Sequence, residues 1–303
     1  MNSAFNPASH SYIMAESVGL YYFSGTGNTE LVAELVRKEF EAAGASVGLV
    51  RIDDVLLSGA APDTSRYSIV GLGYPIHAFN APRIVYDFVD KLPKADGKKT
   101  FLFKCPGDPV MKAGSTSMLV GRLRGRGYVV SHESLFATPS NVAVRVGDDI
   151  VVRLYQVTER KVREAVSEIL SGEKRLQENQ FWLTAVSILF SGGETLGARF
   201  FGRFHLRAGS ACTLCGKCAR ECPLGNIRVK GGKVSFGFNC IMCLRCIYGC
   251  PAKAITPLGF GALLLKPYRR TRDILAEKDP GKMYRPGKIS RAFSSAFHKY
   301  LKG

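Results

Sequence analysis

The sequence CTLCGKCARECP at residues 212–223 returns as CIMCLRCIYGCP at residues 240–251. Both segments have the spacing C-x2-C-x2-C-x3-C-P. Three cysteines separated by two residues each can wrap one face of a 4Fe-4S cube, while a fourth thiolate arrives from elsewhere. Zinc knuckles and disulfides are the alternatives, but zinc sites generally use two paired dithiols. The repeat therefore predicts two 4Fe-4S clusters.

The stretch from about Leu206 to Pro257 resembles a bacterial-type two-cluster ferredoxin domain, a small α+β fold. Ile227 to Ser235 is expected to form a hairpin, with Gly231-Gly232 at its turn. In ferredoxins of this type, the fourth cysteine of each segment ligates the other cluster. The resemblance implies two crossed ligand sets, which are Cys212, Cys215, Cys218 and Cys250 for one cluster and Cys240, Cys243, Cys246 and Cys222 for the other.

Length, composition and cysteine use indicate a two-domain globular protein. The chain has 303 residues, of which 46% are hydrophobic. Eight of its nine cysteines are assigned to clusters that need reduced thiolates, which favours a cytoplasmic location and suggests anaerobic physiology. Residues 1–17 do not resemble a secretory signal. The longest apolar run, Phe181 to Phe190, is too short to cross a bilayer, so no transmembrane segment is expected.

The net charge of +17 is concentrated in the cysteine-containing half. Residues 1–170 hold 19 Lys and Arg against 18 Asp and Glu, a net of +1, whereas residues 171–303 hold 23 against 7, a net of +16. Ferredoxins are commonly acidic, so this charge is a departure from the family. We expect a basic docking face for an acidic redox partner. A solvated basic surface is the alternative, and nucleic acid is disfavoured because no recognised binding module accompanies the charge.

A second informative stretch is VGLYYFSGTGNT at residues 18–29, in which an apolar run precedes a loop of glycines and small hydroxyl residues. The backbone N–H groups of such a loop can close around a phosphate in front of a helix N-terminus. The loop has no lysine, which argues against a P-loop nucleotidase. Its T/S-x-T-G-x-T pattern resembles the phosphate loop of flavodoxins, which bind FMN. The implied FMN-binding residues are Ser24, Gly25, Thr26, Gly27, Asn28 and Thr29.

Apolar runs alternate with helical patterns along the first half of the chain. The predicted strands are Val18–Phe23, Val47–Ile52, Ser68–Tyr74, Thr100–Cys105 and Tyr128–Ser134. A final helix is expected from about Ile150 to Leu170. This alternation predicts an α/β fold, a doubly wound five-stranded parallel sheet. In the flavodoxin order 2-1-3-4-5, the ligand lies at the switch between strands one and three.

The loops after the third and fourth strands are the predicted contacts of the flavin ring. By resemblance to flavodoxin-like proteins, they supply Tyr74, Pro75, Ile76, His77, Ala78, Phe79 and Asn80, and then Cys105, Pro106, Gly107 and Asp108. Tyr74 and Phe79 are candidates for stacking on the ring, with a place in the core as the alternative. A lone loop histidine such as His77 is more often a surface or capping residue than a proton donor to the flavin. Cys105 is interpreted as a small buried or ring-edge residue, and no residue is predicted to be catalytic.

The remaining segments connect or extend these two domains. We expect an N-terminal extension at 1–17, a flavodoxin-like FMN domain at 18–172, a ferredoxin domain at 207–258 and a basic tail at 259–303. The connecting segment 173–206 is too rich in aromatic residues for a flexible linker. Helices packed on one or both domains are predicted there. A helix that contacts a membrane surface or a partner is the alternative.

Taken together, the two halves resemble flavodoxin-ferredoxin fusion proteins over roughly residues 18–257. The resemblance implies an electron-transfer protein with FMN and two 4Fe-4S clusters that serves a partner redox enzyme. The alternative is a flavin-dependent reductase acting on a small-molecule substrate, with His77 or Tyr74 positioning it. A covered flavin face would favour the carrier, and an open one the reductase. No dinucleotide-binding fingerprint supports direct reduction by NAD(P)H.

Overall fold

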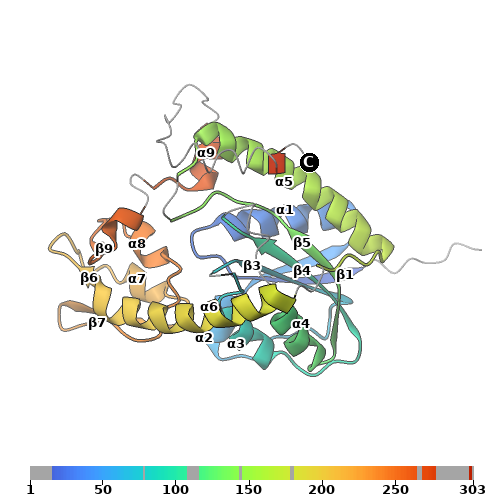
Figure 1. Cartoon of the computed structure of the whole chain (residues 1–303), viewed down its shortest axis with the longest axis horizontal. Helices are drawn as coiled ribbons and strands as arrows, with labels where there is room; N and C mark the ends of the chain where they lie inside the picture. The colour runs from blue at the N-terminus through green and yellow to red at the C-terminus, as the bar shows by residue number, and fades with distance from the viewer. Residues whose placement is uncertain are drawn as a thin grey trace, which may run out of the picture.

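The computed structural model describes residues 16–77, 79–107, 116–142, 145–177, 181–264, 268–277 and 300–301. Four parts of the sequence-based expectations lie outside these residues: most of the N-terminal extension, Ala78, Asp108 and residues 278–299 of the basic tail. Figure 1 shows a sheet flanked by helices, a smaller unit beside it, and one long helix running between the two.

The larger unit is built on a parallel sheet. Among the described residues, its strands are β1 (Ser17–Tyr22), β2 (Ser46–Arg51), β3 (Ile69–Pro75), β4 (Lys98–Cys105) and β5 (Tyr128–Leu135). They lie in the order β2-β1-β3-β4-β5, and every neighbouring pair is parallel. The predicted fold class and strand order are therefore confirmed. The strand order reverses between β1 and β3, which is where this fold binds ligands.

Helices cover both faces of the sheet (Figure 1). They are α1 (Asn28–Ala42), α2 (Ile52–Ser58), α3 (Arg83–Lys91), α4 (Ser117–Arg124) and α5 (Asp148–Ser171). Helices α1 and α5 pack on one face, over Phe101 and Phe103, while α2, α3 and α4 pack on the other, over Leu72 and Leu102. Both sheet faces are thus buried, which explains why the strands read as continuous apolar runs.

The long helix α6 (Phe181–Phe200) continues into a π-helical turn, η1 (Phe201–His205), and leads to the smaller unit. A helix was predicted in this segment. No helix within the described residues is long and apolar enough to cross a membrane.

The smaller unit consists of short elements around an apolar core. Strand β6 (Leu206–Ala208) pairs antiparallel with β9 (Ile255–Pro257), and β7 (Ile227–Lys230) pairs antiparallel with β8 (Lys233–Phe236). Gly231 and Gly232 form the turn of the predicted hairpin with φ of 57° and 68°, which favour glycine. The remaining elements are α7 (Lys217–Arg220), α8 (Arg245–Tyr248), the 3-10 turn η2 (Gly261–Leu263) and α9 (Thr271–Glu277). Helix α9 returns to the larger unit, where Ile274 packs with Leu154 of α5.

Gly19 in β1 has no space for a side chain. A Cβ at this position would lie 2.4 Å from Cδ2 of Tyr67, a buried ring. We expect Gly19→Ala to lower the free energy of unfolding by about 1–3 kcal/mol, since overpacking forces such a ring to move. Urea unfolding followed by far-UV circular dichroism would measure this change.

Gly121→Ala is the matched control. A Cβ at Gly121 of α4 meets nothing within 4 Å, and alanine favours a helix over glycine by about 1 kcal/mol. The control should therefore be as stable as the wild type or more so. Equal losses in both variants would contradict the packing argument.

Candidate functional site

The loop between β1 and α1 has the form of an anion cradle. Gly27 has a φ of 105°, a conformation that favours glycine, and its N–H donates to Ser24 Oγ at 3.1 Å. The N–H groups of Gly25 and Thr26 have no hydrogen-bond partner among the described residues. The first N–H groups of a helix such as α1 also lack intrahelical partners. Unpaired N–H groups at a helix N-terminus suit a phosphate, so the predicted FMN phosphate fits this loop.

A cavity beside this loop brings together most of the predicted flavin contacts. Its lining includes Ser24, Gly25, Thr26, Asn28, Thr29, Pro75, Ile76, His77, Cys105 and Gly107. These residues come from the loops after β1, β3 and β4, at the point where the strand order reverses. Four residues that the sequence analysis missed complete the lining: Thr138, Pro139, Asn141 and Cys243.

Not all predicted residues line this cavity. Tyr74 is 1% exposed and belongs to the core between the sheet and α3, so its placement matches the core alternative and does not support stacking on a flavin. Burial raises the pKa of Tyr74 well above its ordinary value. Pro106 is buried, and its carbonyl accepts the N–H of Thr138 at 2.9 Å. Gly27 borders a different cavity, on the outer side of the loop.

The loop after β3 is a tight turn. The backbones of His77 and Asn80 exchange two hydrogen bonds of 2.9 and 2.8 Å. Asn80 is 4% exposed, and its Oδ1 accepts the hydroxyl of Tyr86 at 2.6 Å, so it supports the turn from within. Phe79 has a φ of 67°, which is uncommon for a bulky residue and often occurs at functional sites. Phe79 therefore stays a candidate for the flavin ring.

Cys105 lies at the end of β4 and is 3% exposed. Burial raises the pKa of its thiol to about 12, against a smaller opposing effect of a hydrogen bond with Thr29. A neutral thiol is a poor nucleophile. Of the two sequence-based alternatives for Cys105, a small buried residue or a ring-edge residue, its burial agrees with the first.

The two cysteine segments share one backbone conformation as well as one spacing. Positive φ angles recur 28 positions apart, at Leu214 and Met242 (54° and 48°), at Gly216 and Leu244 (72° and 60°), and at Gly225 and Lys253 (60° and 49°). A residue with a Cβ loses about 1–2 kcal/mol in this conformation. Because both copies have this unfavourable conformation at the same positions, both loops need the same geometry, such as one that wraps a cluster.

The thiols form two groups. Cys218 interacts electrostatically with Cys212, Cys250 and Cys215. Cys246 interacts with Cys243, Cys240 and Cys222, and more weakly with Cys218. This grouping supports the crossed ligand sets, which stay a prediction.

Backbone N–H groups point at several of the sulfurs. Asn226 donates to Cys222 at 3.2 Å, Met242 to Cys240 at 3.4 Å and Ala254 to Cys250 at 3.3 Å. Such hydrogen bonds stabilise thiolate and set the potential of a cluster. Within the described residues, no three His, Cys, Asp or Glu side chains converge as ligands of a single metal ion would. The fit to a cube rests on the thiol groups, the N–H donors and the repeated backbone.

The two groups differ in burial. Cys215 of the first group is exposed, and the N–H of Lys217 lowers the pKa of its thiol. Cys243 of the second group is 9% exposed. Burial raises the pKa of Cys240 to about 12 and that of Cys246 well above its ordinary value. Cys243 lines the cavity beside the phosphate loop, which we call the flavin cavity. We therefore call the second group proximal and the first group distal.

The proximal segment packs directly on the larger unit. Ile241 and Cys243 belong to the same apolar core as Phe23 of the larger unit. A Cβ on Gly25 would lie 2.5 Å from the backbone oxygen of Cys243, so the phosphate loop and the cluster loop touch where glycine leaves room. The side chain of Arg83 adds a hydrogen bond to Asn239.

A buried ion pair crosses the same boundary. Arg245 Nη1 donates to Asp53 Oδ2 at 2.6 Å, and the Asp53 side chain is only 2% exposed. Arg51 Nη2 donates to the same oxygen at 2.8 Å. Burial by itself would raise the pKa of Asp53, but the hydrogen bonds from Arg245 and Arg51 outweigh it and hold this pKa below its ordinary value. Asp53 therefore stays ionised at neutral pH.

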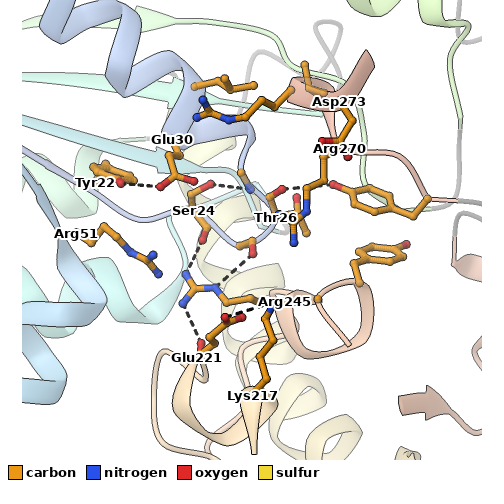
Figure 2. A pocket seen from close by; sticks show the side chains of 18 residues that line it. Tyr22, Ser24, Thr26, Glu30, Arg51, Lys217, Glu221, Arg245, Arg270 and Asp273 are labelled. Atoms are coloured by element: carbon orange, nitrogen blue, oxygen red, sulfur yellow. Dashed lines mark hydrogen bonds and ion pairs between the residues drawn. The ribbon is translucent and has the colours of Figure 1, made fainter. Parts of the chain in front are cut away.

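Figure 2 shows the cavity on the outer side of the phosphate loop, about 270 Å³ in volume, into which Arg245 extends. Basic side chains reach it from several elements: Arg51, Lys217, Arg245, Arg270 and Arg272. Carboxylates balance most of them, since Lys217 lies 3.8 Å from Glu221 and Arg272 lies 2.8 Å from Glu34.

Comparisons with known proteins find similarity to a 4Fe-4S domain and to a flavodoxin. The family model of the 4Fe-4S dicluster domain matches residues 206–251. The flavodoxin of Megasphaera elsdenii is 35% identical over 89 residues, which make up 28% of this chain and 62% of that protein. The chain thus joins a segment similar to a flavodoxin to a 4Fe-4S dicluster domain, the composition of a flavodoxin-ferredoxin fusion. It spans less than two thirds of the length of this curated relative.

Solved flavodoxins resemble the first half of the fusion. Oxidised Flavodoxin 2 from Bacillus cereus is 20% identical, covers 51% of this chain and 98% of its own, and has a TM-score of 0.37. The two-electron reduced Megasphaera elsdenii flavodoxin is 26% identical, covers 50% and 98%, and has a TM-score of 0.33.

The burial of Cys105 leads to a test of its reactivity. With a pKa of about 12, roughly one Cys105 thiol in ten thousand is ionised at pH 8. We expect no thiol of the cluster-loaded native protein to react with Ellman's reagent at pH 8. After unfolding and removal of iron, all nine cysteines should react. A reactive native thiol that disappears in Cys105→Ser would refute this assignment.

Proposed function

We propose that this fusion is an electron-transfer protein that binds FMN and two 4Fe-4S clusters and exchanges electrons with a partner redox protein. The observation that carries the proposal is the position of Cys243, which borders the flavin cavity while it belongs to the proximal thiol group. A cluster held there would be the direct neighbour of the flavin.

The phosphate loop and the cavity support the proposed binding of FMN. The N–H groups of Gly25 and Thr26 and the N-terminus of α1 would bind the phosphate. Pro75, Ile76, His77, Phe79, Cys105 and Gly107 are proposed to lie along the ring. When bound, FMN supplies a centre that holds one or two electrons, whereas each cluster transfers one at a time. The chain would then convert between one-electron and two-electron transfer.

The difference in burial suggests the order of the centres. Cys240, Cys243, Cys246 and Cys222 would hold the proximal cluster, and Cys212, Cys215, Cys218 and Cys250 the distal one. Because Cys215 is exposed, the distal cluster is the proposed docking end. Lys217 and Lys253 lie close to its ligands in the sequence, within the half that carries the positive excess. An acidic partner would be steered to this end.

The coverage of the cavity favours a carrier over a reductase with its own substrate. Cys243 occupies one wall of the cavity. At another wall, Nδ1 of His77 lies 3.6 Å from Oε1 of Glu194, which belongs to α6. These contacts support an internal relay between the two domains.

The cofactor content tests the proposal directly. Protein purified or reconstituted without oxygen should contain about eight iron atoms and one FMN per chain, because eight thiols suffice for two cubes. Iron and flavin analysis together with EPR of the reduced protein would measure this. An iron content near four, or no bound FMN, would contradict the proposal.

The docking end can be tested through charge. The rate constant for reduction of an acidic flavodoxin by this protein should fall as ionic strength rises. The double variant Lys217→Glu/Lys253→Glu should lower it about tenfold at low salt. Lys38→Glu, at an exposed position of α1 in the flavodoxin-like domain, is the control and should leave the rate constant nearly unchanged. Equal effects of both variants, at unchanged iron content, would argue against docking at the distal cluster.

A further inference from the structure

The carbonyl groups of the phosphate loop are held from the outside by residues that follow the flavodoxin-like domain. Arg245 Nη2 donates to the oxygen of Ser24 at 2.6 Å, and Arg245 Nε donates to the oxygen of Gly25 at 3.4 Å. Tyr268 Oη donates to the oxygen of Thr26 at 3.5 Å. Figure 2 shows the guanidinium of Arg245 approaching the loop from the side of Glu221 and Lys217.

These contacts fix the direction of the loop's N–H groups. In a trans peptide, the C=O of one residue and the N–H of the next point in opposite directions. Holding the oxygens of Ser24 and Gly25 toward Arg245 therefore turns the N–H groups of Gly25 and Thr26 to the other side of the loop. Those are the two N–H groups without a partner among the described residues. Arg245 thus presents donors to a phosphate that it does not touch.

Arg245 is itself held in place. Its Nη1 donates to Asp53 and to the backbone oxygen of Glu221, at 2.6 and 2.9 Å, and its side chain is 11% exposed. It lies between Cys243 and Cys246, directly after Leu244, which has a φ of 60°. A change in the path of the proximal cluster loop would move Arg245 and release the two carbonyls.

We propose that Arg245 is a positioning residue of the FMN site, and that through it FMN binding and assembly of the proximal cluster strengthen each other. This inference rests on the proposed function, since it requires both cofactors. The coupling is reciprocal: an intact cluster loop raises the affinity for FMN, and bound FMN slows the loss of the proximal cluster.

The test compares FMN with riboflavin, which has the same ring and no phosphate. Dissociation constants would be measured by flavin fluorescence under anaerobic conditions, with iron content confirmed for each protein. Arg245→Met should weaken FMN binding by roughly 5- to 150-fold, the usual range of such couplings. Riboflavin binding should change little, so the preference for FMN over riboflavin should fall.

Arg83→Met is the matched control. Arg83 also bonds across the domain boundary, to Asn239, but it does not contact the phosphate loop. The preference for FMN should survive in this variant. Arg245→Lys keeps a positive charge beside Asp53 and guards against misfolding. One ammonium group cannot span both carbonyls and Asp53, so a loss of preference is expected here too.

Two results would overturn the inference. One is an unchanged FMN affinity in both Arg245 variants. The other is an equal weakening of FMN and riboflavin, which would mean that Arg245 acts only through domain packing. Wild-type protein that binds no FMN at all would instead contradict the proposed function. As a second readout, FMN should slow chelator-driven loss of iron in the wild type and do so less in Arg245→Met.

Discussion

The arrangement of the two domains depends on one buried carboxylate. Asp53 lies in the first turn of α2, directly after β2. Its side chain is almost completely inaccessible and accepts hydrogen bonds from Arg51 of its own domain and Arg245 of the other. An ion removed from water costs several kcal/mol unless it is paired with good geometry. A different orientation of the domains would leave this charge half compensated. The apolar contacts of Ile241 and Cys243 hold the domains together, while Asp53 selects a single way of joining them.

Much of the fold and part of the site could be predicted because they depend on local pattern. Continuous apolar runs marked the strands, since both faces of a parallel sheet are buried. Gly25 and Gly27, with the hydroxyl residues Ser24, Thr26 and Thr29, marked the phosphate loop. The cluster loops were also marked by a local pattern, the cysteine spacing, because three ligands of a cube come from one tight turn.

The parts that could not be predicted involve contacts between residues far apart in the chain. Cys243 reaches the flavin cavity only because the second domain packs against the first. The sequence around Cys243 does not indicate that Gly25 is its neighbour. Asn141, in the loop after β5, donates a hydrogen bond to Thr26 Oγ1 at 3.0 Å. That loop could have been suspected, because the carboxyl ends of parallel strands share one edge. Tyr74 shows the opposite error, where a residue at the right strand end points into the core.

The two cysteine segments, 28 residues apart, share a backbone conformation but differ in their surroundings. Both copies have the same left-handed positions, and the second packs on the larger unit through Ile241 and Cys243. Where the first copy has Gly216 and Lys217, the second has Leu244 and Arg245. Leu244 is 7% exposed and packs into the small domain's core, and Arg245 replaces a lysine's single ammonium with a planar group of several donors. Arg245, together with Ile241 and Cys243, thus makes the second copy a loop that joins the domains.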